Sequence, residues 1–530
     1  MAFLKHKVDA EGIEDGTILR RSNVDMRDSE TEHRDVEGWK SFAEDTTLHG
    51  ARFFFADNFF RRLLWIAAVL GCAIFCNYQV YTFVRHFYER PFNTKITFDR
   101  DNDENAFPFP AVTLCNLNAL NKRKLIKSLT NVYGQATVDK KLQDMYLIIR
   151  RSKAAFTKEF KKRNPEFFHR SQTVNETQTN FWIAGDDMED MLLPTSPEFS
   201  SCSINGKQCN AHNFTSSLSA FHGLKCHTFN SAEGGNPLLN TTVAGLPSGL
   251  RLRLNIERDE YIPIPWRPSV GILLLIHEQK TFLPVEEFGI IIQPGMSSLC
   301  AIKRRKIINL EKPYATNCRK GSLRFDRDFA YTKPACMVNC RNDYIIKACG
   351  CTVIKFQANR PIPICAVNDS ILCVFPSYEN FGTSSEKSAC ERKCGEPCEY
   401  VEYKTSLSYS GLQRDAFIEQ LMFSLNNTEK SGMELEMYKP FLNMTEEQRE
   451  KFVDENIISL DIYFEDLSVE IVEQKPVFET WALIGNLGGT FGLFLGMSFL
   501  TLLESFDFVF RRILHLFKAT KNKKSLASDR

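Results

Sequence analysis

Two long apolar stretches interrupt an otherwise mixed pattern of polar and apolar residues. Residues 63–84 read LLWIAAVLGCAIFCNYQVYTFV, and residues 481–503 read WALIGNLGGTFGLFLGMSFLTLL. Neither stretch contains a charged side chain, and each has about the 20 residues that a helix needs to cross the hydrocarbon core of a bilayer. The pattern therefore predicts two transmembrane helices. The first stretch starts far from Met1 and lacks a small-residue cleavage site, so we expect the mature protein to retain it.

Basic residues flank the two stretches on the sides away from the middle of the chain. Arg52, Arg61 and Arg62 precede the first stretch, and the second is followed by Arg511, Arg512, Lys518, Lys521, Lys523 and Lys524. Basic residues concentrate on the cytoplasmic side of membrane helices. We therefore expect both termini in the cytoplasm of a multi-pass protein organised as an N-terminal segment 1–62, a first helix 63–84, an extracellular domain 85–478, a second helix 479–503 and a tail 504–530.

Glycosylation sequons and cysteines support the same topology. All six Asn-x-Ser/Thr sequons fall in the middle segment, at Asn175, Asn213, Asn240, Asn368, Asn426 and Asn443. Of the 17 cysteines, Cys72 and Cys76 lie in the first apolar stretch and the others lie in the middle segment. Because an oxidising compartment favours disulfides, we interpret the middle segment as a disulfide-bonded extracellular domain. A zinc site at Cys336, Cys340, Cys349 and Cys351 is the alternative, and spacing alone does not reveal the disulfide pairing.

The middle segment contains both helical and strand patterns. Apolar residues with helical spacing, from Leu142 to Phe160, predict an amphipathic helix with a basic polar side. We interpret that basic side as solvated surface, although a peptide- or lipid-binding face is the alternative. Alternating or continuous apolar runs predict strands at 251–256, 271–277, 289–292 and 457–464. This mixture predicts an α+β membrane protein.

Composition excludes several classes of function. The chain has 66 basic and 65 acidic residues among 530, so no basic excess is left to neutralise the phosphates of a nucleic acid. Its 43 phenylalanines argue against disorder throughout. The sequence has no Walker loop and no Gly-x-Ser-x-Gly elbow, and His277-Glu278 lacks the second histidine of a zinc protease. We expect neither an enzyme nor a bound cofactor or metal ion.

The second apolar stretch is unusually rich in glycine. Gly485, Gly488, Gly489, Gly492 and Gly496 fall within twelve positions. Small residues let helices approach closely, so a tight oligomer interface is one interpretation. The other is a pore, in which several copies surround an axis and an unwound turn at Gly496, Met497 and Ser498 exposes backbone carbonyls or a hydroxyl to an ion. Glu504 and Asp507 would then lie at the inner mouth, although a solvated helix end also accounts for them.

Several ordered motifs resemble one known family. Residues 109–118, FPAVTLCNLN, follow the first stretch, and residues 492–504, GLFLGMSFLTLLE, close the second. Both are similar to motifs of the degenerin, epithelial sodium channel and acid-sensing ion channel family. The resemblance extends from Thr47-Leu48-His49-Gly50 to Asp507. It implies a plasma membrane homotrimer, with related subunits as alternative partners, and a hand-like ectodomain of palm, finger, thumb, knuckle and β-ball regions.

The resemblance also implies roles for individual residues. Gly496, Met497 and Ser498 match the family's Gly-x-Ser selectivity filter for sodium ions. His49 and Gly50 match its cytoplasmic gating pair, and Gly489 matches the site where bulky residues hold such channels open. The blocker amiloride is expected to act near Gly489. Asn486 stands where acid-sensing relatives have Asp, so conductance or block by divalent ions is expected to differ.

Disulfide pairs are a further implication of the resemblance. Carried over position by position, they are Cys115 with Cys226, Cys202 with Cys209, Cys318 with Cys398, Cys336 with Cys394, Cys340 with Cys390, Cys349 with Cys373, and Cys351 with Cys365. Cys72, Cys76 and Cys300 are left free. The spacing from Cys390 to Cys394 is two residues longer than in acid-sensing channels. This departure bears on the pairing of Cys340, whose expected partner is Cys390.

The stimulus is predicted from where the chain departs from acid-sensing channels. Those channels carry a histidine pair shortly after the first span, where this chain has Pro91-Phe92-Asn93-Thr94-Lys95. Asp259-Glu260-Tyr261 is kept, but the acidic stretch that follows is replaced by Pro265-Trp266-Arg267-Pro268. Loss of titratable groups weakens a pH switch. The sequence looks more like the branch opened by extracellular FMRFamide-type neuropeptides, with proton-gated, bile-acid-sensitive, constitutively active and mechanically gated channels as alternatives.

A function from another class also fits the topology. A two-span cell-surface receptor without a pore would account for the apolar stretches, the sequons and the cysteines. It would not account for a glycine-rich second stretch that ends in Gly-x-Ser and an acidic pair.

Overall fold

The chain folds into two compact units that we describe separately. A computed structural model describes residues 39–99, 107–133, 182–196, 199–219, 224–233, 237–262, 269–324, 328–353, 362–363, 365, 373–427, 438 and 440–528. One unit, the membrane unit, comprises Met1–Phe92 and Pro476–Arg530, and the outer unit comprises Asn93–Lys475. The helix predicted at 142–160 lies outside the described residues, as do the sequons at Asn175 and Asn368.

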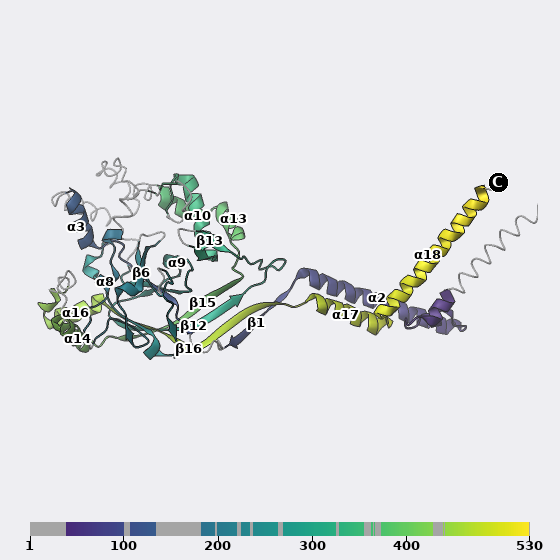
Figure 1. Cartoon of the computed structure of the whole chain (residues 1–530), viewed down its shortest axis with the longest axis horizontal. Coiled ribbons are helices and arrows are strands. Elements are labelled where there is room, and N and C mark those ends of the chain that lie inside the picture. Colours follow the sequence, from purple (N-terminus) through teal and green to yellow (C-terminus); the bar gives the residue numbers. More distant parts are fainter. Residues whose placement is uncertain are drawn as a thin grey trace, which may run out of the picture. The chain divides into compact units, whose positions relative to one another are not determined.

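The outer unit contains a seven-stranded sheet (Figure 1). Its strands run in the order β15-β12-β16-β9-β4-β5, and β1 also pairs with β16. Their bounds are β15 Glu399–Gly411, β12 Met296–Ile308, β16 Ile457–Pro476, β9 Leu250–Asn255, β4 Cys202–Ile204, β5 Lys207–Gln208 and β1 Phe92–Asp99. Strand β12, next to the edge strand β15, pairs with β16 in parallel and with β15 in antiparallel orientation.

A second, five-stranded sheet is antiparallel throughout. Its order is β11-β10-β3-β7-β6, with bounds β11 Ile290–Ile292, β10 Ile272–His277, β3 Ala111–Asn116, β7 Lys225–Phe229 and β6 Phe214–Leu218. All six residues of β3 are buried, so the FPAVTLCNLN motif supplies a central strand. Short pairs join β2 Phe107–Pro108 to β8 Asn240–Thr241, and β13 Ser322–Arg324 to β14 Asp328–Ala330.

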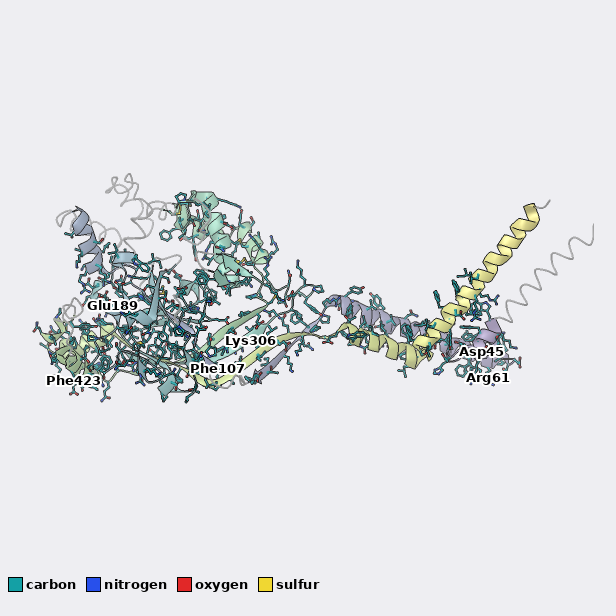
Figure 2. All side chains as sticks on the ribbon, viewed as in Figure 1. Asp45, Arg61, Phe107, Glu189, Lys306 and Phe423 are labelled. Atoms are coloured by element: carbon teal, nitrogen blue, oxygen red, sulfur yellow. A yellow bond between two sulfur atoms is a disulfide. The ribbon has the colours of Figure 1, made fainter. Side chains whose placement is uncertain are left out.

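Side chains from both sheets form one hydrophobic core. It includes Leu114 of β3, Leu252 of β9, Leu274 of β10 and Leu460 of β16. Phe107, labelled in Figure 2, packs edge-on against Phe464 with ring centroids 4.9 Å apart. Burial of such side chains is the main favourable contribution to folding. The four strands predicted from apolar runs are confirmed, with bounds shifted by one residue at β9, β10 and β11 and with β16 extended to Pro476.

The outer unit also contains helices. The described ones are α3 Lys122–Tyr133, α8 Met188–Met191, α9 Val285–Phe288, α10 Lys333–Cys349, α12 Phe375–Phe381, α13 Ser385–Lys393, α14 Arg414–Asn427 and α16 Glu446–Asn456. The Thr332 hydroxyl caps α10, and Thr445 and Gln448 form a capping box on α16. Helices α14 and α16 contribute Leu421 and Val453 to a second core. The predicted α+β class is confirmed.

Seven disulfides crosslink the outer unit. They join Cys115 with Cys226, Cys202 with Cys209, Cys318 with Cys398, Cys336 with Cys394, Cys340 with Cys390, Cys349 with Cys373, and Cys351 with Cys365. These are the seven pairs that the family resemblance implies, the Cys340 pair included. All four cysteines of the alternative zinc site are used in these bonds, and no metal-binding group of three or more His, Cys, Asp or Glu occurs in the described residues. That alternative is therefore wrong for these cysteines.

Strand β16 is tied to its neighbours by ion pairs before the chain reaches the membrane unit. The Arg305 guanidinium on β12 lies 2.7 Å from a Glu470 oxygen on β16 and 3.2 Å from Glu402 on β15. Lys303 lies 3.0 Å from Glu465. Arg305 thus links three strands, and β16 ends at Pro476, four residues before the next helix.

In its described residues, the membrane unit contains helical residues 39–45, a short η1 turn, Ala51–Phe55, and three longer helices. These are α2 Phe59–Glu89, α17 Thr480–Leu495 and α18 Phe499–Ser528. Among the described residues, α2 is the single helix long and apolar enough to span a bilayer by itself, whereas α17 and α18 qualify together and meet at a bend of 71°. The predicted stretch 63–84 lies within α2. The second predicted stretch is not one continuous helix, because the chain leaves helical geometry between Leu495 and Phe499.

Candidate ion pathway

The break in the second span falls at the predicted selectivity filter. Gly496 ends α17 with φ of 66°, in the left-handed region that glycine adopts without steric cost. Its N–H donates to the Gly492 carbonyl at 3.0 Å, and the Met497 N–H donates to Phe491 at 3.2 Å. Met497 and Ser498 lie outside both helices. An interrupted membrane helix of this kind can present backbone oxygens to a cation, as the pore interpretation requires.

The predicted gating histidine lies directly against this break. The His49 N–H donates a 3.0 Å hydrogen bond to the Leu495 carbonyl. A Cβ added to Gly496 would lie 2.5 Å from His49 Cγ, so only a glycine fits there beside the imidazole ring. The structure therefore brings together two sets of residues that are far apart in the sequence, the predicted gating pair and the predicted filter.

Gly50 places the N-terminal segment against the first span. Its φ is 86°, and an added Cβ would lie 2.8 Å from Val69 Cγ2 and 3.3 Å from Trp65 Cε3 on α2. Phe53 stacks on Trp65 with ring centroids 4.4 Å apart. Phe42 stacks on Phe508 of α18 at 4.3 Å. The segment thus contacts both spans of the membrane unit.

The glycine face of α17 is open within one chain. Added Cβ atoms at Gly485, Gly488 and Gly489 would meet nothing within 4 Å. Helix α17 contacts α2 through Phe494 and Phe75, whose ring centroids are 5.0 Å apart (Figure 1). The close packing that these glycines permit is therefore not made with α2.

The three polar residues expected at the pore mouths lie on α17 and α18. The Asn486 carbonyl accepts a hydrogen bond from the Thr490 hydroxyl at 2.8 Å, within the same helix. Glu504 is exposed. Asp507 is exposed too and pairs with Arg511 one turn later at 2.7 Å, so the solvated-helix interpretation accounts for its position within one chain.

Four predicted glycosylation sites belong to the described outer unit. Asn213, Asn240, Asn426 and Asn443 are all exposed to solvent. Exposure is a requirement for modification of the side-chain amide, and these four asparagines meet it.

A buried polar cluster in the outer unit was not found from the sequence. Asp186 is 3% exposed, and its two carboxylate oxygens accept hydrogen bonds from Asn116 at 2.7 Å and Asn121 at 2.8 Å. The Asn121 amide also donates to Glu257 at 2.6 Å. Burial raises the pKa of Asp186 to about 7. The asparagines of the FPAVTLCNLN motif could have indicated such a cluster, because amide side chains on or next to a buried strand need hydrogen-bond partners.

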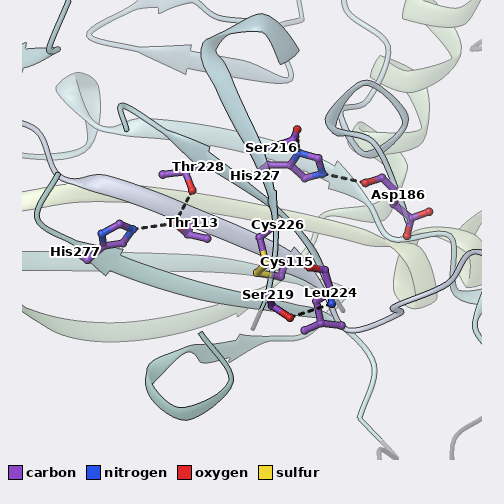
Figure 3. The surroundings of a disulfide bond; sticks show 10 residues. All are labelled: Thr113, Cys115, Asp186, Ser216, Ser219, Leu224, Cys226, His227, Thr228 and His277. Carbon is purple, nitrogen blue, oxygen red and sulfur yellow. Dashed lines mark hydrogen bonds between the residues drawn. A yellow bond between two sulfur atoms is a disulfide. The ribbon is translucent and has the colours of Figure 1, made fainter. Parts of the chain in front are cut away.

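Two histidines lie on strands β7 and β10 of the five-stranded sheet, and His227 of β7 contacts Asp186 of this cluster (Figure 3). His227 Nε2 lies 2.9 Å from the Asp186 carbonyl, and His227 Nδ1 lies 2.9 Å from the Ser216 hydroxyl. His277 hydrogen-bonds Thr113 at 2.9 Å. Burial lowers the pKa of both histidines, that of His277 to about 4. These rings are therefore neutral at physiological pH.

Comparison with known proteins identifies the family. The profile of the family described as amiloride-sensitive sodium channels matches residues 42–508. The chain belongs to this family. Acid-sensing ion channel 2 of Homo sapiens is 30% identical over 496 residues, which cover 89% of this chain and 86% of the relative. Acid-sensing ion channel 1C of Danio rerio is also 30% identical, with 88% and 82% covered. Acid-sensing ion channel 1 of Gallus gallus is 28% identical, with 93% and 88% covered.

Family membership establishes the general function. Members of the amiloride-sensitive sodium channel family are plasma membrane ion channels rather than enzymes, so the chain is a sodium channel homologous to acid-sensing channels. This favours a channel over the receptor without a pore.

Proposed function

We propose that the chain forms a homotrimeric, amiloride-sensitive sodium channel that extracellular FMRFamide-type neuropeptides open. Three second spans would surround the pore, with Gly496, Met497 and Ser498 as the filter and both termini in the cytoplasm. The open glycine face of α17 supports the trimer, because close packing at that face needs another chain. Amiloride would block near Gly489.

The observation that carries the choice of stimulus is the state of the histidines in the outer core. His227 is buried and His277 is half-buried, and desolvation lowers the pKa of both side chains, that of His277 to about 4. His277 therefore stays neutral until well below physiological pH. The histidine pair of acid-sensing channels is replaced at 91–95. The resemblance to the neuropeptide-gated branch then supplies the ligand class.

Ligand gating requires that the peptide bind one arrangement of the outer unit more tightly than another. A peptide that bound both equally would open nothing. Strand β16 is the proposed route of coupling, because it is one strand from the outer core to Pro476 and the chain enters α17 four residues later.

Proton gating is the second candidate, and Asp186 is the observation that favours it. Its pKa of about 7 makes it a group that titrates near physiological pH inside a buried cluster. An acid response would therefore direct attention to Asp186 rather than to the histidines.

The test is two-electrode recording from oocytes that express the chain alone. Amidated peptides including FMRFamide are applied at neutral pH, and pH is stepped separately from about 7.5 to about 4, a range that brackets carboxylate and histidine titration. Sodium replacement and amiloride identify the current. Peptide-evoked, amiloride-sensitive sodium current with little acid response is the expected result.

Other outcomes decide between the alternatives. Acid-evoked current without a peptide response would replace the neuropeptide proposal by proton gating. Gly489→Phe, which places a bulky side chain on the glycine face, is expected to give a constitutive current. Silence of both wild type and Gly489→Phe, with surface expression shown by biotinylation, would contradict a homomeric channel.

A further inference from the structure

Thr501 is a buried polar side chain among exposed apolar neighbours. It lies in the first turn of α18 and is 0% exposed, whereas Leu500 and Leu502 are 67% and 51% exposed. A hydroxyl enclosed in this way needs hydrogen-bond partners, because leaving it unsatisfied in an apolar environment costs free energy.

The Thr501 hydroxyl has partners on two different segments. Its oxygen accepts from the Ser498 N–H at 3.1 Å and lies 3.1 Å from the Ser498 hydroxyl. It also hydrogen-bonds the hydroxyl of Thr47, in the segment that leads to His49. A hydroxyl offers one donor and two acceptor positions, so these three contacts use its full capacity.

The backbone and the side chain of Ser498 both form hydrogen bonds with Thr501. Its N–H donates to Thr501 Oγ1, and its own hydroxyl accepts the Thr501 N–H at 3.2 Å. The reciprocal pair fixes both the backbone and the side-chain rotamer of Ser498. The same Thr501 hydroxyl connects this residue to the N-terminal segment that carries the gating pair.

We propose that Thr501 is a positioning residue for ion selectivity, which orients Ser498 in the filter and couples that orientation to the N-terminal segment through Thr47. The proposal rests on the proposed filter at 496–498. Thr501 need not touch the ion, because it acts through the geometry of Ser498.

The test is the ratio of sodium to potassium permeability, measured from reversal potentials of the full chain in oocytes. Currents are opened with Gly489→Phe or with FMRFamide. Thr501→Val keeps the shape but removes the hydroxyl, and we expect it to lower the ratio about fivefold or more, the factor that corresponds to one hydrogen bond. Thr501→Ser restores the hydroxyl and is expected to restore the ratio.

The matched control is Thr82→Val on α2. The Thr82 hydroxyl donates only to the Tyr78 carbonyl one turn earlier, at 2.9 Å, so its loss should leave the ratio unchanged. Ser498→Ala distinguishes the proposed filter assignment from the proposed positioning role of Thr501. If it changes the ratio while Thr501→Val does not, the positioning role fails alone, and if neither changes the ratio, the filter assignment fails as well.

Thermal stability tests the contact between Thr47 and Thr501 even if the variants carry no current. Thr47→Val, Thr501→Val and the double variant are compared by melting temperature of the detergent-solubilised chain. A shared hydrogen bond predicts that the double variant loses less than the sum of the single losses. Additive losses would overturn the link between Thr47 and Thr501, and with it the proposed coupling.

Discussion

At the scale of single residues, Asp186 shows how the fold changes the chemistry of a side chain. Its oxygens accept two asparagine amides, and the groups that influence it also include Glu257, Lys124 and Asp190. Burial has the largest effect and raises the pKa from 3.8 to about 7. The folded chain therefore holds a proton at pH values where the unfolded chain has released it.

This difference predicts a pH dependence of stability. The contribution of protonated Asp186 is complete below about pH 4 and is lost as pH rises through 7, at up to about 1.4 kcal/mol per pH unit. Asp186→Asn is neutral at every pH. We therefore expect the melting temperature of the variant to fall less than that of wild type between about pH 5 and pH 8. Parallel curves for the two proteins would contradict the raised pKa.

The neighbouring Asp187 is the matched control. Burial alone would raise its pKa, but hydrogen bonds and charge interactions with Lys124 and Lys225 outweigh that effect and lower it. Asp187 is then ionised in both the folded and the unfolded chain above about pH 5. Asp187→Asn should lower the melting temperature at each pH, because buried Lys225 loses its partner, without changing the slope.

At the scale of elements, the docking of the N-terminal segment depends on two glycines in left-handed conformation. Gly50 lies against Trp65 and Val69 of α2, and Gly496 lies against His49. Side chains at either position would meet both backbone strain and a close contact. The two glycines thus determine where the segment contacts α2 and the proposed filter.

Gly50→Ala is accordingly expected to abolish most of the current while the chain still reaches the surface. Gly71→Ala is its control, because Gly71 lies inside α2 and an added Cβ meets nothing within 4 Å. Alanine favours a helix by about 1 kcal/mol over glycine, so that variant should conduct like wild type. Recording and biotinylation of both variants check this, and equal currents would show that Gly50 is not required for docking.

At the scale of the whole molecule, one chain leaves the face of α17 with Gly485, Gly488 and Gly489 uncovered. Small residues on membrane helices allow close helix–helix contact, and no helix in the described part of the chain covers this face, so we propose that another copy does. Closed rotational symmetry would bring these faces to a common axis. A closed ring of copies such as the proposed homotrimer agrees with that arrangement, and the family resemblance supplies the number three.

Counting subunits tests this directly. Single channels labelled with one fluorophore per chain are expected to bleach in three steps. Gly488→Cys should also form oxidised dimers between copies, whereas Gly71→Cys, on the other span, should not. Predominantly two or four bleaching steps would contradict the trimer, irrespective of which stimulus opens the channel.

Much of the architecture can be predicted from the sequence, because it depends on local patterns of residues. The apolar stretch 63–84 predicts a membrane helix because its composition suits hydrocarbon, and the runs at 271–277 and 457–464 predict buried strands because their side chains require a core. The FPAVTLCNLN and GLFLGMSFLTLLE motifs indicate the family without any knowledge of tertiary contacts. These features depend on residues that are neighbours along the chain.

Contacts between residues far apart in the sequence became visible only in the folded structure. Neither His49 nor Gly496 carries a local signal of the other, and the hydroxyl of Thr501 is unremarkable until Thr47 and Ser498 enclose it. The pKa of Asp186 likewise follows from burial beside Asn116 and Asn121, which the folded chain brings together. Burial and hydrogen-bond partners depend on three-dimensional packing. They therefore cannot be predicted from the residues that are neighbours along the chain.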